Sequence, residues 1–140
     1  MGLDVGFKKI GVALSDPLRI TVSPYKVIYR RTNRETFEEL LKVIEEKEVS
    51  DVVVGIPVNM KGEKTKIGDK IEKFAEKFRA FLDERGVSVN FHFFDESYST
   101  LEAEELMRSL GKRRDVVDDV AAALILREWL EVRDEEKEER

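Results

Sequence analysis

The chain lacks cysteine and glutamine, and it has one histidine and one tryptophan. Without cysteine it can form no disulfide bond, no thiolate zinc site and no cysteine nucleophile. It also lacks an apolar run of about eighteen residues and a signal-peptide layout, so we expect a cytoplasmic protein with no membrane partner. Because 41% of its 140 residues are hydrophobic, we expect one compact domain with a core of its own.

Charge is abundant but unevenly placed. Charged residues make up 39% of the chain and the net charge is −5, which argues against broad binding to nucleic acid. Basic residues nevertheless cluster at Lys8–Lys9, Arg30–Arg34, Lys61–Lys66 and Lys112–Arg114. Clusters that converge in space can still bind phosphate, so the net charge alone does not exclude such a partner.

The order of apolar patterns and turn residues predicts an α/β fold. The expected elements are strands 2–6 and 9–15 joined as a hairpin, strand 25–29, a helix capped by Asn33, parallel strand 51–56, helix 67–82, strand 87–93, and helices at about 99–110 and 117–132. An antiparallel meander that leads into βα crossover units makes a mixed five-stranded sheet with helices on both faces. We expect one domain over residues 1–132 and a charged tail over 133–140 that frays.

Asp4 is the residue that fits its local surroundings least well. It lies within a predicted strand between Leu3 and Val5, with Gly2 and Gly6 two positions away on either side. Strands are depleted in Asp and Gly, and these three residues share one strand face. That face therefore has room for a metal ion or for a phosphate backbone. The alternative is an ordinary acid near a turn at the surface.

Two further acids lie at comparable places. Glu96 follows Asp95 where the last predicted strand ends, and ligands of α/β sheets gather beyond such carboxyl ends. Asp118 shares a helical stripe with apolar residues, where an acid must be solvated, paired or bound to metal. Each has a simpler alternative: a polar exit from the strand for Glu96, and a helix cap with Asp115 for Asp118.

Three carboxylates among small residues suit a hard cation such as Mg²⁺, and two such ions can activate water and stabilise a leaving oxygen. No other catalytic motif competes, because G-x-S-x-G, HExxH and the Walker phosphate loop are all missing. For the single histidine, His92, we expect a surface or packing role.

Four segments resemble, in order, the motifs of the YqgF/RuvX-type proteins. They are Gly2-Leu-Asp-Val-Gly-Phe-Lys-Lys-Ile-Gly-Val-Ala-Leu-Ser-Asp16, Val54-Gly-Ile-Pro-Val-Asn-Met-Lys-Gly62, Asp95-Glu-Ser-Tyr-Ser-Thr-Leu-Glu-Ala103 and Val117-Asp-Asp-Val-Ala-Ala-Ala-Leu-Ile-Leu126. The resemblance implies an RNase H-like fold and maps the family's three acidic positions onto Asp4, Glu96 and Asp118. It also implies two Mg²⁺ or Mn²⁺ ions and in-line attack by water, which leaves a 5′-phosphate and a 3′-hydroxyl.

The same resemblance implies a hydrolase that matures the 5′ end of the precursor of 16S ribosomal RNA. We expect the protein to be a monomer or weak homodimer. The residues expected to contact nucleic acid are Lys8, Lys9, Asn59, Lys61, Lys64, Ser97 and Thr100. Two alternatives remain: a Holliday junction resolvase acting on branched DNA, and a non-catalytic RNA-binding module. Phe7, Lys9 and Ser97 depart from the family pattern, which usually has Thr, Arg and Arg there, and lysine cannot replace the bidentate phosphate contact of arginine.

Overall fold

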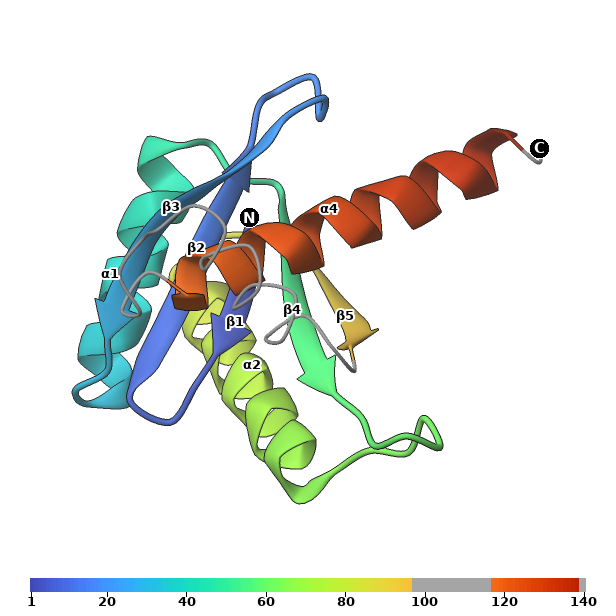
Figure 1. Ribbon diagram of the computed structural model, residues 1–140. Helices are drawn as coiled ribbons and strands as arrows, with labels where there is room; N and C mark the ends of the chain where they lie inside the picture. The colour runs from blue at the N-terminus through green and yellow to red at the C-terminus, as the bar shows by residue number, and fades with distance from the viewer. Residues whose placement is uncertain (97–116, 139–140) are drawn as a thin grey trace.

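The computed structural model describes residues 1–96 and 117–138 and contains one mixed five-stranded sheet (Figure 1). The spatial order of the strands is β3-β2-β1-β4-β5. The strands are β1 (Gly2–Val5), β2 (Lys9–Ser15), β3 (Val22–Tyr29), β4 (Asp51–Pro57) and β5 (Asn90–Glu96), and the helices are α1 (Asn33–Glu46), α2 (Lys66–Glu84) and α4 (Val117–Glu138).

Strand direction gives the sheet two distinct ends. β1 runs parallel to β4, and β4 runs parallel to β5, whereas β2 is antiparallel to both β1 and β3. The C-terminal residues of β1, β4 and β5 therefore meet at one end of the sheet, which we call the carboxyl end. The opposite end, where β4 and β5 begin, is the amino end. The predicted mixed sheet and its parallel strand at 51–56 are confirmed.

Helices α1 and α2 cover one face of the sheet (Figure 1). Phe37 of α1 packs against Phe74 and Phe78 of α2, with ring centroids 5.2 and 5.3 Å apart. Both helices begin at a threonine cap, since the hydroxyl of Thr32 accepts from the backbone N–H of Glu35 and that of Thr65 accepts from Gly68. The α1 cap is thus Thr32, one residue before the predicted Asn33, and it forms the Thr-x-x-Glu pattern of a capping box.

Helix α4 crosses the other face of the sheet (Figure 1). Its Ala122 and Ile125 are fully buried and pack in one cluster with Ala13 of β2 and Val53 of β4. The small alanine side chains let the helix approach the backbone of β1 closely. No helix within residues 1–96 and 117–138 is both long and apolar enough to span a bilayer.

Three predicted elements have different boundaries in the structure. Strand β3 begins at Val22 rather than residue 25, because it lies at the edge of the sheet, where Pro24 is tolerated. Strand β5 spans Asn90–Glu96 rather than 87–93. Helix α4 continues to Glu138 instead of ending at Val132, since no glycine or proline follows to stop it. The helix predicted at about 99–110 lies outside the described residues.

Candidate active site

Asp4 lies near the carboxyl end of β1, the central strand, on the face that α4 covers. Its partner on β2 is Gly11. On the other side, β1 pairs Leu3 with Val54, and this register continued by one residue brings Gly55 of β4 beside Asp4. Both neighbouring strands thus present a glycine to this partly buried carboxylate. Sequence reasoning missed Gly11 and Gly55, although a glycine inside a strand often signals close approach of another group.

The two glycines on either side of Asp4 in the sequence have a different role from the predicted one. A β-carbon on Gly2 would lie 2.8 Å from the carbonyl oxygen of Ala122 and 2.8 Å from the Cβ of Leu126. The absence of a side chain at Gly2 therefore lets helix α4 pack against β1. A β-carbon on Gly6 would lie 2.8 Å from the carbonyl oxygen of Lys9, so Gly6 closes the turn after β1. The space at these two glycines is therefore filled by protein. The positions level with Asp4 on the two adjacent strands, Gly11 and Gly55, also carry no side chain.

Glu96 is the last residue of β5, at the same end of the sheet as Asp4. The register pairs Ile56 with Asp95 and Pro57 with Glu96. Because Val5 is level with Ile56 in the continued register, Asp95 lies one position beyond the level of Asp4 and Glu96 lies two positions beyond it. Strand pairing thus fixes how far along the sheet each of these two adjacent residues lies.

Asp118 is the second residue of α4. It lies one helical turn before Ala122, the residue whose carbonyl oxygen meets Gly2. Helix α4 packs its later turns, at Leu126 and Leu130, near Met1 at the amino end of the sheet. Its first turn therefore points toward the carboxyl end, which is the level of Asp4. The side chains of Glu96 and Asp118 lie outside the described residues, so their roles remain predictions.

Lys9 is a predicted nucleic-acid contact that lies on β2, the strand next to Asp4. It lies two residues from Gly11 on the same strand face. Its partner on β3 is Tyr29, and the Lys9 ammonium lies 5.6 Å from the centroid of that ring. Lys8 is exposed in the turn between β1 and β2. Sequence reasoning did not identify Tyr29, whose side chain is 58% exposed on this face.

The loop after β4 holds the next three predicted contacts at the same end of the sheet. The side-chain oxygen of Asn59 accepts from the backbone N–H groups of Lys61 and Glu63, so Asn59 shapes the loop. The ammonium of Lys64 pairs with Glu72 of α2. Lys61 is exposed. A phosphate would therefore reach Lys61 freely but would compete with Glu72 for Lys64.

Ser97 and Thr100, the remaining two predicted contacts, lie outside the described residues. Among the side chains that the structure describes, no three His, Asp or Glu residues lie close enough together to hold a metal ion. That set contains Asp4 without Glu96 or Asp118, so the predicted metal site stays a prediction.

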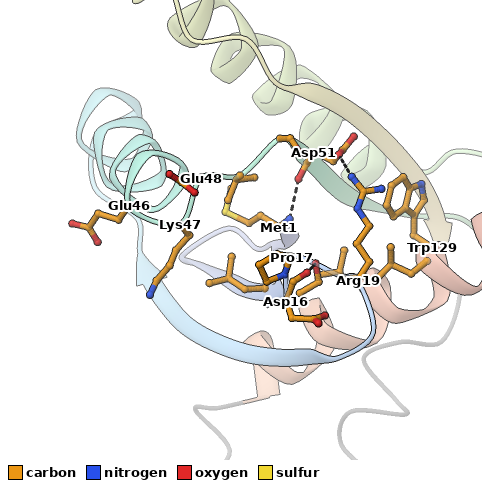
Figure 2. Close-up of a pocket in the computed structure, with 15 residues that line it drawn as sticks. Met1, Asp16, Pro17, Arg19, Glu46, Lys47, Glu48, Asp51 and Trp129 are labelled. Atoms are coloured by element: carbon orange, nitrogen blue, oxygen red, sulfur yellow. Dashed lines mark hydrogen bonds and ion pairs between the residues drawn. The ribbon is translucent and has the colours of Figure 1, made fainter.

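The amino end of the sheet holds a pocket of about 510 Å³ beside Asp51 of β4. Figure 2 shows Arg19 reaching Asp51 on one side, with Glu46, Lys47 and Glu48 across the pocket. Arg19 Nη2 donates to Asp51 Oδ2 at 2.6 Å, and Ser50 Oγ donates to the same oxygen at 3.1 Å.

His92 Nε2 lies 2.9 Å from Asp51 Oδ1, and the His92 ring packs on Trp129 of α4 at 4.6 Å between centroids. The packing role expected for His92 is thus confirmed. Burial alone raises the pKa of Asp51, but hydrogen bonds from His92 and Ser50 and the charge of Arg19 outweigh it and hold that pKa below its usual value. The ionised carboxylate of Asp51 therefore stabilises the amino end of the sheet through its hydrogen bonds.

Comparison with known proteins agrees with this topology. The family model of RuvX, described as a Holliday junction resolvase, matches residues 1–132. A protein of Maridesulfovibrio salexigens is 37% identical over 134 residues, which cover 93% of this chain and 96% of that one. A protein of Lachnospira eligens is 42% identical over 139 residues, covering 94% and 95%. Both carry the name "Putative pre-16S rRNA nuclease".

Solved structures of proteins with much lower sequence identity share the fold. Thermus thermophilus RuvC in complex with a Holliday junction substrate superposes with a TM-score of 0.55 and 14% identity, over 89% of this chain and 88% of that one. A second Thermus thermophilus RuvC structure gives a TM-score of 0.51. At this identity the likeness shows the fold alone, which is RNase H-like. With a family model over residues 1–132 and relatives 37–42% identical over most of their length, the chain belongs to the RuvX family.

Proposed function

We propose that this protein is a divalent-metal-dependent nuclease that matures the 5′ end of the precursor of 16S ribosomal RNA in the cytoplasm. The observation that carries the proposal is the register at the carboxyl end of the sheet. It brings Asp4 of β1 to the same end of the sheet as the last residue of β5, Glu96, and helix α4, whose second residue is Asp118, packs on the face that carries Asp4. Family membership and the names of the relatives support the same reaction class.

The residues at this end of the sheet fit a hard divalent cation. Carboxylate oxygens are the ligands that Mg²⁺ and Mn²⁺ prefer, and the strand neighbours of Asp4 on both sides are glycines, which add no side chain that would compete with a cation for the Asp4 carboxylate. Asp4, Glu96 and Asp118 would hold two ions between them. When bound, the ions supply positive charge that stabilises the oxygens of the reacting phosphate.

The reaction inserts water across one phosphodiester bond. The water oxygen bonds to phosphorus, the bond from phosphorus to the 3′ oxygen breaks, and that oxygen leaves as a hydroxyl after taking a proton. Lys9, on the sheet face of Asp4, would pair with a backbone phosphate beside the one attacked. Lys8 and Lys61 would hold the strand on the two loops at the same end of the sheet.

The test is cleavage of a fragment that spans the 5′ end of the 16S precursor, with Mg²⁺ or Mn²⁺ present. Wild-type protein should cut it, and Asp4→Asn should not. Asp83→Asn, which changes the same charge at an exposed site on α2, is the matched control and should cut at the wild-type rate. Equal cleavage by wild type and Asp4→Asn would refute the proposal. Binding that survives loss of Asp4, Glu96 and Asp118 in a protein that never cleaves would indicate the RNA-binding module instead.

A second candidate is resolution of branched DNA, which the description of the family model favours. Symmetric cutting of a four-way junction needs a two-fold dimer, because two strands must meet two equivalent sites. The same proteins should therefore be tested on a four-way DNA junction, with their mass in solution measured alongside. Paired cuts by a dimer would support the resolvase, whereas a monomer or weak dimer that leaves junctions intact would support the RNA nuclease.

A further inference from the structure

The side chain of Phe7 is 88% exposed at the tip of the turn between β1 and β2. This turn begins three residues after Asp4 and lies at the carboxyl end of the sheet (Figure 1). A single exposed apolar residue is common on protein surfaces. Phe7 differs because its backbone is fixed and its surroundings are basic, as the contacts of the turn show.

Three hydrogen bonds hold the turn in place. The backbone N–H of Gly6 donates to the carbonyl of Lys9 at 2.8 Å, and the backbone N–H of Arg30 donates to the carbonyl of Lys8 at 2.8 Å. The side chain of Arg30 donates to the carbonyl of Gly6 at 2.8 Å, and its guanidinium lies on the ring of Phe74. The turn therefore presents Phe7 outward from an ordered backbone, so little entropy is lost when the ring contacts a ligand.

The charge around Phe7 is positive. Lys8, Lys9 and Arg30 surround the turn, and none of them forms an ion pair with a carboxylate within residues 1–96 and 117–138. Beyond Lys9 lies the exposed ring of Tyr29, which faces the same side of the sheet as Asp4. Two exposed aromatic rings separated by a lysine suit a nucleic acid strand, whose bases stack on aromatic rings while its phosphates meet basic groups.

We propose that Phe7 stacks on an unpaired base next to the phosphate that is cleaved at Asp4, with Lys9 and Tyr29 contacting the next nucleotide. The substrate class is then a single strand or an unpaired stretch, RNA or DNA, because bases within a duplex are already stacked on each other. This inference rests on the proposed nuclease function and adds which form of the nucleic acid is cut.

Binding of a labelled 12-nucleotide single strand and of the corresponding blunt duplex tests the inference, with EDTA present to prevent cleavage. RNA and DNA forms of each are compared. Loss of one aromatic stack is expected to weaken binding about tenfold, so Phe7→Ala should bind the single strand about tenfold more weakly and leave duplex binding within about twofold. Phe7→Tyr keeps a ring and should stay within about twofold of wild type. Leu18→Ala removes an equally exposed apolar side chain (77% exposed) from the turn at the other end of β2 and should change neither.

A second readout reports the stack directly. The fluorescence of a single strand with 2-aminopurine at successive positions should be quenched at one position by wild type and Phe7→Tyr, and not by Phe7→Ala. Phe7→Ala that binds both forms like wild type, or weakens both equally, would overturn the inference. If wild type still cleaves in an Asp4-dependent way, the nuclease proposal survives that result. Wild type that neither binds nor cleaves any form would overturn both.

Discussion

Asp4 and Asp51 lie on neighbouring parallel strands at opposite ends of one sheet, and their surroundings differ in kind. Asp51 receives hydrogen bonds from Arg19, Ser50 and His92 within 3.1 Å. Asp4 has glycines at the nearest positions of both adjacent strands. The first arrangement neutralises a carboxylate with groups of the protein. The second places two residues without side chains beside a carboxylate, which we expect to favour the binding of a cation.

From this comparison we expect stability and chemistry to depend on different ends of the sheet. Asp51 joins the start of β4 to the loop after β2 and, through His92 and Trp129, to α4. A pocket of about 510 Å³ lies here, and the acid beside it, Asp51, is paired with Arg19 and His92. Function in α/β sheets gathers at the carboxyl ends of the strands, and in this molecule that is the end with Asp4.

The largest expected effect is the difference in cleavage rate between the Asp4→Asn and Asp51→Asn variants. Asp4→Asn should lower the rate of precursor cleavage about a thousandfold, since it removes a charged group that acts on the transition state. Asp51→Asn should lower the rate per folded molecule less than about twofold. Single-turnover rates with saturating Mg²⁺ make the comparison. Similar losses in both variants would show that the two ends are not separate in function.

Gly2→Ala should reduce both stability and rate. The new methyl would overlap the backbone of Ala122, so α4 must shift at an expected cost of about 1–3 kcal/mol. The shift also moves the turn that carries Asp118. Gly86→Ala is the control, because its φ of +70° costs an alanine about 1 kcal/mol while open space surrounds it far from Asp4. Denaturant unfolding and cleavage rates should show loss of both in Gly2→Ala and loss of stability alone in Gly86→Ala.

Asp51→Asn should lower the free energy of unfolding by about 1–2 kcal/mol, because Arg19 and His92 lose a charged partner that is only partly screened by water. Urea unfolding at pH 7 measures this loss. Asp83→Asn, at an exposed position, should stay within about 0.5 kcal/mol of wild type. Equal stabilities of all three proteins would mean that the Asp51 cluster does not hold the amino end together.

The smallest expected effect is the pH dependence of the difference in unfolding free energy between wild type and Asp51→Asn. The pKa of Asp51 in the folded protein lies below its unfolded value of about 3.9, so its contribution to stability is fully present above that value. The contribution disappears as the pH falls through the lower, folded pKa. The stability gap between wild type and Asp51→Asn should therefore be constant from pH 7 to 5 and shrink toward pH 3. A gap that grows on acidification would contradict the assignment.

Much of the fold was predictable from local pattern. The hairpin at Phe7–Lys8, the buried strand that starts at Asp51 and the amphipathic helix that ends before Gly86 all follow from periodicity and turn residues. The boundaries that failed depended on tertiary context. The edge position of β3 tolerates Pro24, and no residue pattern states which strand will lie at an edge.

The candidate site was predictable only in part. Asp4 could be singled out because an acid inside a strand is unusual, but Gly11 and Gly55 become its neighbours only through strand pairing. The level of Glu96 beside Pro57 likewise follows only from strand pairing. The Asp51 cluster was not foreseen, since Arg19, Asp51 and His92 are far apart in the chain and meet only in the folded sheet.

The central claim, that the carboxyl end of the sheet binds the catalytic cations, is tested most directly by thermal unfolding during a Mn²⁺ titration. A ligand at about a hundred times its dissociation constant stabilises a fold by about 2.7 kcal/mol, which for a domain of this size raises Tm by roughly 5–10 °C. Wild type and Asp51→Asn should both show this rise, and Asp4→Asn should show almost none. A rise that is the same in all three proteins, or one that is lost with Asp51 and kept without Asp4, would contradict the account.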